Sequence, residues 1–269
     1  MCISARAAAG KIIQTCRDTI SIVAVALNSP RRLGKADDTE PESNDLYKMH
    51  DDLLDKYARW LCAFPVAAKN FLRSRMDCKI KGWDDDEHVR YRQDELIFLL
   101  NPDDTQSILN GQHTVLVVLD RLRALAYDTC FVADLKLHPT ATAELYNQLN
   151  AHINSLSGAF GAMERISGFA LPFVYVAHLR LFILLYLFLF NMYSIANAWV
   201  EESYLSADGW IALIVLLALN WAILGLEAAS VEMERPFGLS PNHLPLAKFC
   251  IVVGENIVQT LDEVKQQQS

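Results

Sequence analysis

The sequence predicts an all-α membrane protein in which a soluble helical body precedes a transmembrane helical hairpin. Two apolar runs, residues 181–200 and 209–226, contain no Asp, Glu, Lys or Arg. The first has about the 20 residues that a helix needs to cross the hydrocarbon core of a bilayer, and the second is near the lower limit. The polar segment between them, residues 201–208, is too short for a domain. No region alternates between polar and apolar residues with a period of two, so no sheet is expected.

The acidic composition and the scattered cysteines exclude several classes of protein. The chain has 269 residues with 24 Lys and Arg against 32 Asp and Glu, and its net charge of −8 argues against a nucleic-acid partner. Six cysteines occur without a C-x-x-C pair, so we expect small buried hydrophobic side chains and neither a zinc site nor a disulfide framework. The chain also lacks a P-loop, a G-x-G-x-x-G turn and a G-x-S-x-G elbow. The sequence therefore predicts no enzyme, no cofactor and no metal site.

Apolar residues at helical spacing predict helices throughout the first two-thirds of the chain. The expected helices span residues 5–28, 46–75, 94–100 and 105–130, with an acidic helix start at 82–87 and a last helix from its N-cap Thr140 to residue 166. Ser29-Pro30 is expected to end the first helix, because the residue before a proline is pushed out of the helical region. We therefore expect three parts: a cytosolic helical body at residues 1–168, the hairpin at 169–235 and a cytosolic C-terminal segment at 236–269.

The charges that flank the hairpin predict its orientation. Arg180 lies before the first apolar run and Arg235 follows the second, whereas residues 201–208 contain no Lys or Arg. The positive-inside rule then puts both outer ends, and the helical body with them, in the cytosol or its equivalent. Trp199 and Trp210 lie at the loop ends of the two runs, where interfacial indoles are favoured, so the two signals agree.

Five polar residues in or beside the apolar runs are expected to find partners. We expect Glu227 to contact a polar group near the membrane surface, because a carboxylate at depth is costly. Asn191 and Asn220 are expected to hydrogen-bond between helices. His178 and Arg180 are expected to extend toward the membrane surface, with a pore vestibule or a neighbouring helix as alternatives. An ion-binding role is the alternative for the acidic and amide residues.

Three residue patterns occur together in the second half of the chain. They are Glu164-Arg165-Ile166 followed by Leu171-Pro172-Phe173-Val174-Tyr175, an apolar span after His178 and Arg180, and Glu232-Met233-Glu234-Arg235-Pro236-Phe237-Gly238 followed by Pro241-Asn242-His243-Leu244-Pro245-Leu246. The E-R-I motif or the P-F-G motif alone would be weak evidence for a family, but the combination of the two is specific. The chain resembles the bestrophin family, with a bacterial-type pattern, over about residues 5–261 and most strongly over 162–246.

The resemblance implies an ion channel subunit, a multi-pass integral protein of the lipid bilayer that assembles as a homopentamer around one pore. Such a channel passes chloride or other small anions passively. The apolar residue before the proline of the L-P pattern would form a constriction near the cytosolic exit, which makes Leu171 the aperture candidate and Pro172 the start of the next helix. A ring of leucines selects by size and dewetting instead of by fixed charge. The alternative for Leu171 is ordinary packing, and Pro236-Phe237-Gly238 is expected to be a structural turn after the last membrane helix.

The sequence departs from the family pattern in two places. Ala5-Arg6 and Gly10 resemble the stretch that ends the family's second membrane helix, so the neck of the pore is expected to be missing, either through N-terminal truncation or because the subunit is short. Upstream coding sequence with two more apolar helices would support a channel. A short protein would favour a non-conducting membrane scaffold or a regulatory partner of full-length channels. Residues 239–243 offer no carboxylate, so no calcium site of the animal type is expected. A plasma membrane, mitochondrion or plastid all fit.

Overall fold

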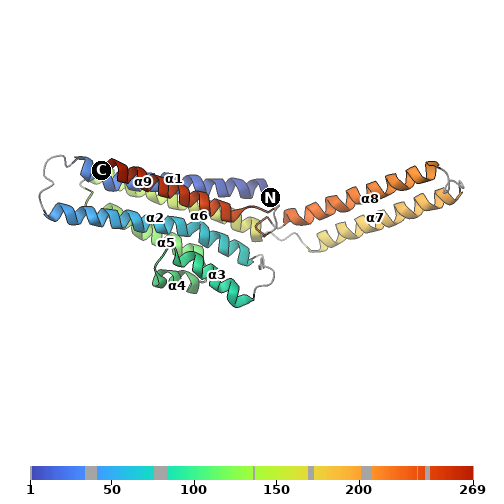
Figure 1. The fold of residues 1–269 in the computed structure, drawn as a ribbon, viewed down its shortest axis with the longest axis horizontal. Coiled ribbons are helices and arrows are strands. Elements are labelled where there is room, and N and C mark those ends of the chain that lie inside the picture. The colour runs from blue at the N-terminus through green and yellow to red at the C-terminus, as the bar shows by residue number, and fades with distance from the viewer. Residues whose placement is uncertain are drawn as a thin grey trace. The chain divides into compact units, whose positions relative to one another are not determined.

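Helices make up the regular secondary structure of the protein in a computed structural model (Figure 1). The structure describes residues 2–33, 41–75, 84–135, 137–168, 173–200, 207–234, 236–239 and 243–268. No strand occurs among them. The predicted all-α fold class is therefore confirmed.

The chain forms two compact units. One unit, called here the helical body, comprises Met1–Ser167 and Phe237–Ser269, and the other, called here the hairpin, comprises Gly168–Pro236. The body contains α1 (Cys2–Leu33), α2 (Pro41–Arg75), α3 (Asp85–Ile97), α4 (Pro102–Asn110), α5 (Thr114–Tyr127), a short π-helix η1 (Asp128–Val132), most of α6 (Pro139–Gly168) and α9 (Leu246–Gln268). The hairpin contains α7 (Phe173–Val200) and α8 (Ala207–Glu234).

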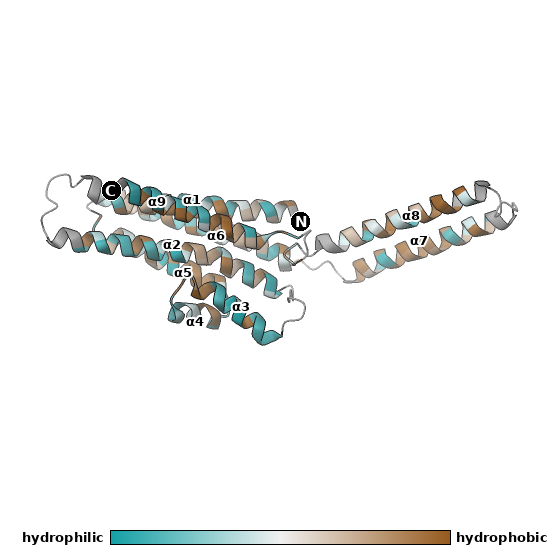
Figure 2. Ribbon diagram, in the orientation of Figure 1, coloured by the Kyte–Doolittle hydropathy of each residue, from teal (hydrophilic) through white to brown (hydrophobic). Residues whose placement is uncertain are grey.

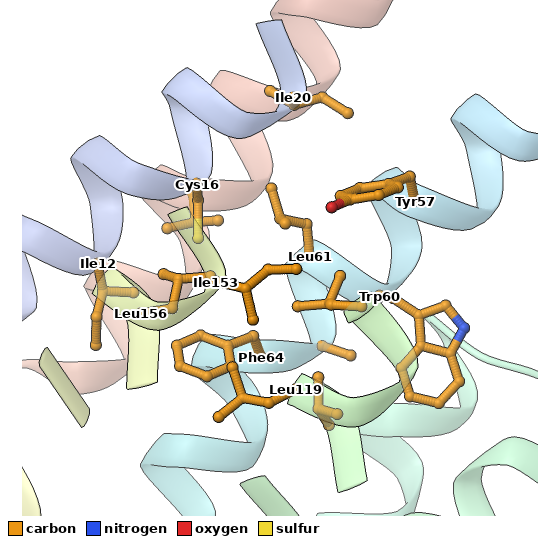
Figure 3. Packing of buried hydrophobic residues seen from close by; sticks show 14 of the residues in the cluster. Ile12, Cys16, Ile20, Tyr57, Trp60, Leu61, Phe64, Leu119, Ile153 and Leu156 are labelled. Atoms are coloured by element: carbon orange, nitrogen blue, oxygen red, sulfur yellow. The ribbon is translucent and has the colours of Figure 1, made fainter. Parts of the chain in front are cut away.

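The core of the helical body forms where α1, α2, α5, α6 and α9 meet (Figure 3). Tyr57, Leu61 and Phe64 recur along one face of α2 at the spacing of a helical turn, and all three are fully buried. Leu119 of α5 and Ile153 of α6 are buried in the same cluster. Helix α9 packs against both α1 and α2, so this C-terminal helix belongs to the body and not to a separate unit.

Helix α1 continues past the proline that was expected to end it. The prediction of a stop at Ser29-Pro30 is wrong, because α1 extends to Leu33. Pro30 has no N–H to donate to the carbonyl of Ala26, one turn earlier. The Ser29 hydroxyl donates to that carbonyl at 2.8 Å instead. A local side-chain hydrogen bond therefore satisfies the acceptor that the proline leaves open.

The helix predicted at residues 105–130 is broken, so this prediction is also wrong. Helix α4 ends at Asn110 and α5 begins at Thr114. Gly111 takes an extended backbone conformation, with ψ of 133°. A Cβ atom on Gly111 would lie 2.7 Å from Val117 Cγ2, so the glycine permits the chain to pass close to α5.

The acidic start expected at residues 82–87 is present as an N-cap. Asp84 Oδ1 accepts the Glu87 backbone N–H at 2.7 Å, and Glu87 Oε2 accepts the Asp84 N–H at 3.2 Å. These reciprocal bonds form a capping box. The helix that they begin runs over Asp85–Ile97, so the separate helix predicted at 94–100 is wrong.

Helix α6 begins two residues earlier than a helix with Thr140 as its N-cap would. Its first residue is Pro139, which suits that position because its missing N–H would have no partner there. The ring Nδ1 of His138 accepts the Thr140 backbone N–H at 3.4 Å, and the His138 carbonyl accepts the Ala141 N–H at 2.8 Å. His138 therefore occupies the capping position that was predicted for Thr140.

The partly buried thiols of Cys62 on α2 and Cys250 on α9 predict a loss of stability at alkaline pH. Burial raises the pKa of each from the ordinary 9.0 to about 11. An unfolded thiol ionises first, so stability is fully present below pH 9.0 and falls as pH rises toward 11. We expect the urea midpoint to fall across that window in the wild type and to fall less in a Cys62→Ala, Cys250→Ala variant. Equal pH slopes for the two proteins would contradict the prediction.

Candidate functional site

Both helices of the hairpin are long and apolar enough to cross a membrane. The candidate spans are Val174–Asn197 in α7 and Leu213–Ser230 in α8. Only 6% of the first span and 0% of the second is buried within the chain. Figure 2 shows hydrophobic residues along both helices. Apolar surfaces of this extent are normally covered by lipid or by other protein chains.

An amide pair links the two helices within their apolar stretches. Asn220 Nδ2 donates to Asn191 Oδ1 across the hairpin at 3.0 Å. Polar side chains in such an environment find partners on neighbouring helices, since lipid offers none. The expected hydrogen bond of these residues between helices is confirmed.

An ion pair links α7 to α8 at a second position along the two helices. Arg180 Nε donates to Glu227 Oε1 at 2.8 Å, with side-chain exposures of 44% and 28% within the isolated chain. Glu227 thus has the polar partner that was expected for it. Arg180 makes the contact with a neighbouring helix that was the alternative to extension toward the membrane surface. The pair neutralises one charge of each sign within the hairpin.

The aperture candidate lies in the connection that leads into the hairpin. Leu171 and Pro172 fall outside the described residues, between the end of α6 at Gly168 and the start of α7 at Phe173. Their role at a constriction remains a prediction from the family resemblance.

The segment Pro236-Phe237-Gly238 forms a turn between α8 and α9. The Phe237 side chain is 0% exposed and belongs to the core of the helical body, together with Leu244. A Cβ atom on Gly238 would clash with His243 Nδ1, so the imidazole packs directly against the glycine backbone. A larger residue at Gly238 would have to displace that ring.

Glu164 of the E-R-I pattern lies in a cluster of charged and aromatic side chains. Its Oε1 atom is 2.7 Å from Arg75 Nη1 and 3.7 Å from His113 Nε2. The His113 ring stacks on Phe71 with ring centroids 4.3 Å apart, and Phe160 packs edge-on against both rings. These five residues are called here the Glu164 cluster. They join α2 and the start of α5 to the part of α6 that precedes Leu171.

The partners of Glu164 could not be found from sequence reasoning. Arg75 lies 89 residues away along the chain, and no periodic pattern relates the two. The E-R-I pattern itself was the available signal. The ion pair is partly exposed and is worth no more than about 1 kcal/mol, so the aromatic contacts are needed to fix this part of α6.

Within the described ranges, no group of three or more His, Cys, Asp or Glu side chains is arranged to hold a metal ion. The functional features of the hairpin are therefore its apolar surface, its two polar links and the connections at its ends. This combination defines an all-helical protein with a hairpin suited to a membrane.

Comparison with known proteins gives the family within that class. Residues 3–259 match the model of the bacterial and fungal bestrophin family, so the chain belongs to this family. The resemblance seen in the sequence is thereby confirmed. Two solved point variants of a bacterial bestrophin homologue from Klebsiella pneumoniae have TM-scores of 0.67 and 0.66, at 17% and 18% identity. Each comparison covers 96% of this chain and 78% of the other, and identity at this level shows a shared fold alone.

Curated relatives share more sequence over a shorter stretch. A voltage-dependent anion channel-forming protein of Nostoc sp. is 32% identical over 105 residues, which cover 39% of this chain and 31% of that protein. A protein of the same description from Synechocystis sp. is 29% identical over 119 residues, with 41% and 36% covered. The matches thus span about a third of the length of these relatives.

Proposed function

We propose that the chain is a subunit of an oligomeric channel that passes chloride and other small anions passively across a membrane. The observation that carries the proposal is the hairpin, in which almost no residue of the two apolar spans is buried within the chain. Membership of the bestrophin family and the description of its relatives as anion channel-forming proteins support the same activity.

The hairpin needs further chains to surround a pore. Two helices cannot enclose an aqueous path, whereas several copies of the hairpin can bury its apolar faces against lipid and against one another. The family resemblance favours five copies. Arg180 and Glu227 are the two residues among Asp, Glu, Lys and Arg within the candidate spans Val174–Asn197 and Leu213–Ser230, and they neutralise each other, so these spans supply no unpaired charge of that kind as a fixed filter. Selection by size at an apolar constriction, with Leu171 as its residue, fits this arrangement.

The orientation follows from the charges in the sequence. The positive-inside rule, applied to Arg180 near the start of α7 and to Arg235 after α8, favours a helical body on the cytosolic side or its equivalent. A plasma membrane, a mitochondrial membrane and a plastid membrane are all compatible with this orientation. No enzymatic activity belongs to this proposal.

Ion flux through liposomes tests the function. The purified protein is reconstituted in vesicles that contain a chloride-quenched dye, and a chloride gradient is applied. We expect quenching well above that of empty vesicles when chloride is applied, and no quenching when an impermeant anion replaces chloride. Cation flux without chloride flux would overturn anion conduction. No flux of either kind would favour the alternative of a membrane scaffold or a regulatory partner.

Leu171→Ala is expected to change the relative permeability of anions. A smaller side chain widens an apolar constriction, so large anions should gain several-fold relative to chloride. Bilayer recordings of reversal potentials under mixed-anion gradients measure this ratio. Leu116→Ala is the matched control, since Leu116 is an exposed residue of α5 in the helical body. Unchanged permeability ratios in Leu171→Ala would remove Leu171 from the aperture.

A further inference from the structure

The helical body contains a pocket of about 300 Å³ between α2, α3, α4 and the start of α5. Apolar side chains make up much of its lining, including Ala67, Phe71, Leu96 and Ile108. The volume is at the small end of the range of ligand sites, about 300–1,000 Å³. Such a site fits a compact organic molecule better than a dinucleotide or a peptide.

Two polar atoms at the pocket lack partners within the protein. Asn70 Nδ2 and Thr114 Oγ1 are buried, belong to lining residues and make no hydrogen bond. Buried polar atoms are nearly always paired in native proteins, so each such atom calls for an explanation. The Asn70 amide nitrogen is a donor, and the Thr114 hydroxyl can donate as well. Both atoms are inaccessible to solvent, so a ligand with acceptor atoms would satisfy them once the two side chains rotate toward it.

The charge of the lining also favours an acceptor. Arg92 of α3 lines the pocket, is partly exposed and forms no ion pair with any residue that the structure describes. No Asp or Glu is present among the lining residues. Gln112 adds a further amide at an exposed position. The site therefore combines one cation and several neutral donors with an apolar wall.

The break between α4 and α5 creates this arrangement. Gly111 allows the chain to leave α4 and pass close to Val117, because a Cβ atom at this position would lie only 2.7 Å from Val117 Cγ2. Gln112 and Thr114 follow directly and line the pocket. A continuous helix through residues 105–130, as the sequence predicted, would not place Gln112 in a connection between two helices or Thr114 at the start of one.

We infer that this pocket binds a small monocarboxylate with an apolar body, such as a short aliphatic or an aromatic acid. The guanidinium of Arg92 would pair with the carboxylate, which also accepts hydrogen bonds from Asn70 and Thr114. The side chains of Phe71 and Leu96 would cover the apolar body. A cationic ligand would meet the charge of Arg92 with no carboxylate to offset it. The inference does not depend on ion conduction.

Fluorine NMR of para-fluorobenzoate with the detergent-solubilised protein tests this site. We expect saturable binding of the carboxylate and binding of para-fluorobenzylamine that is at least about tenfold weaker. Arg92→Gln should weaken carboxylate binding on the order of tenfold, as expected for loss of a charge-assisted hydrogen bond. Arg90→Gln is the matched control, because Arg90 is exposed on the same helix and does not line the pocket.

The comparison between the two arginine variants removes the effect of the detergent, because micelles take up the probe equally in both samples. Thermal unfolding of each variant checks that the fold is intact. Thr114→Val provides a second variant that keeps the side-chain volume and removes the hydroxyl, and it should also weaken binding. Equal effects of Arg92→Gln and Arg90→Gln, equal binding of the amine, or no saturable binding would each overturn the inference.

Discussion

Phe237→Ala is expected to destabilise the helical body by roughly 3–5 kcal/mol, the range for removal of a buried aromatic ring. Phe237 is 0% exposed and belongs to the core of the body, although it lies in the turn that directly follows the hairpin. Alanine would leave a cavity and would loosen the connection from α8 to α9. Urea unfolding of the protein in detergent, followed by circular dichroism, measures the free energy of unfolding.

Leu239→Ala is the matched control for Phe237→Ala. Leu239 lies two residues later in the same turn and is 45% exposed, so its truncation should change stability by no more than about 0.5 kcal/mol. Phe237→Leu keeps much of the volume and should lie between the other two variants. If Phe237→Ala were no more destabilising than Leu239→Ala, the ring would not contribute to the core.

The parts of the fold that the sequence predicted well depend on local composition alone. A bilayer requires long apolar helices, so uninterrupted runs at residues 181–200 and 209–226 were sufficient to identify α7 and α8. The need of Asn191 and Asn220 for a partner was predictable for the same reason. The partner of Glu227 was not, because Arg180 lies 47 residues away and only the pairing of the helices brings it close.

The predictions that failed depended on contacts that composition does not specify. Pro30 did not end α1, because the hydroxyl of Ser29 satisfies the Ala26 carbonyl. The break at Gly111 is set by the close approach of the chain to Val117, a tertiary contact. Element ends are therefore decided by single hydrogen bonds and single close contacts, whereas the presence of the main helices is decided by periodicity over many residues.

The candidate site was predictable to different degrees for different residues. Leu171 was selected through the family resemblance and not through spacing or charge. The Glu164 cluster was missed, since Arg75 and His113 come from distant segments and carry no pattern of their own. The pocket beside Arg92 was also missed, because it depends on the break at Gly111. A site that forms where several helices converge can be identified from the structure but not from the sequence alone.

Glu227→Gln is expected to destabilise the packing of α7 against α8, because it leaves the Arg180 guanidinium without its carboxylate partner. Loss of one member of a fully buried pair costs about 3–5 kcal/mol. The two side chains are 44% and 28% exposed in the isolated chain, so we expect about 1–3 kcal/mol here. Arg180→Gln should have a similar effect. The double variant should be milder than the sum of the two single changes, since it leaves neither charge unpaired.

Hydrogen–deuterium exchange of α7 and α8 peptides in detergent measures this effect, because local opening of the hairpin exposes its amides. A loss of about 1.4 kcal/mol raises the rate of exchange about tenfold. Glu255→Gln makes the same chemical change at an exposed position of α9 and should leave hairpin exchange unchanged. If the effects of the two single variants add fully in the double variant, Arg180 and Glu227 do not act as a pair. Glu227 would then contribute through a separate contact, and the hairpin would present an unpaired carboxylate to the membrane or to a pore.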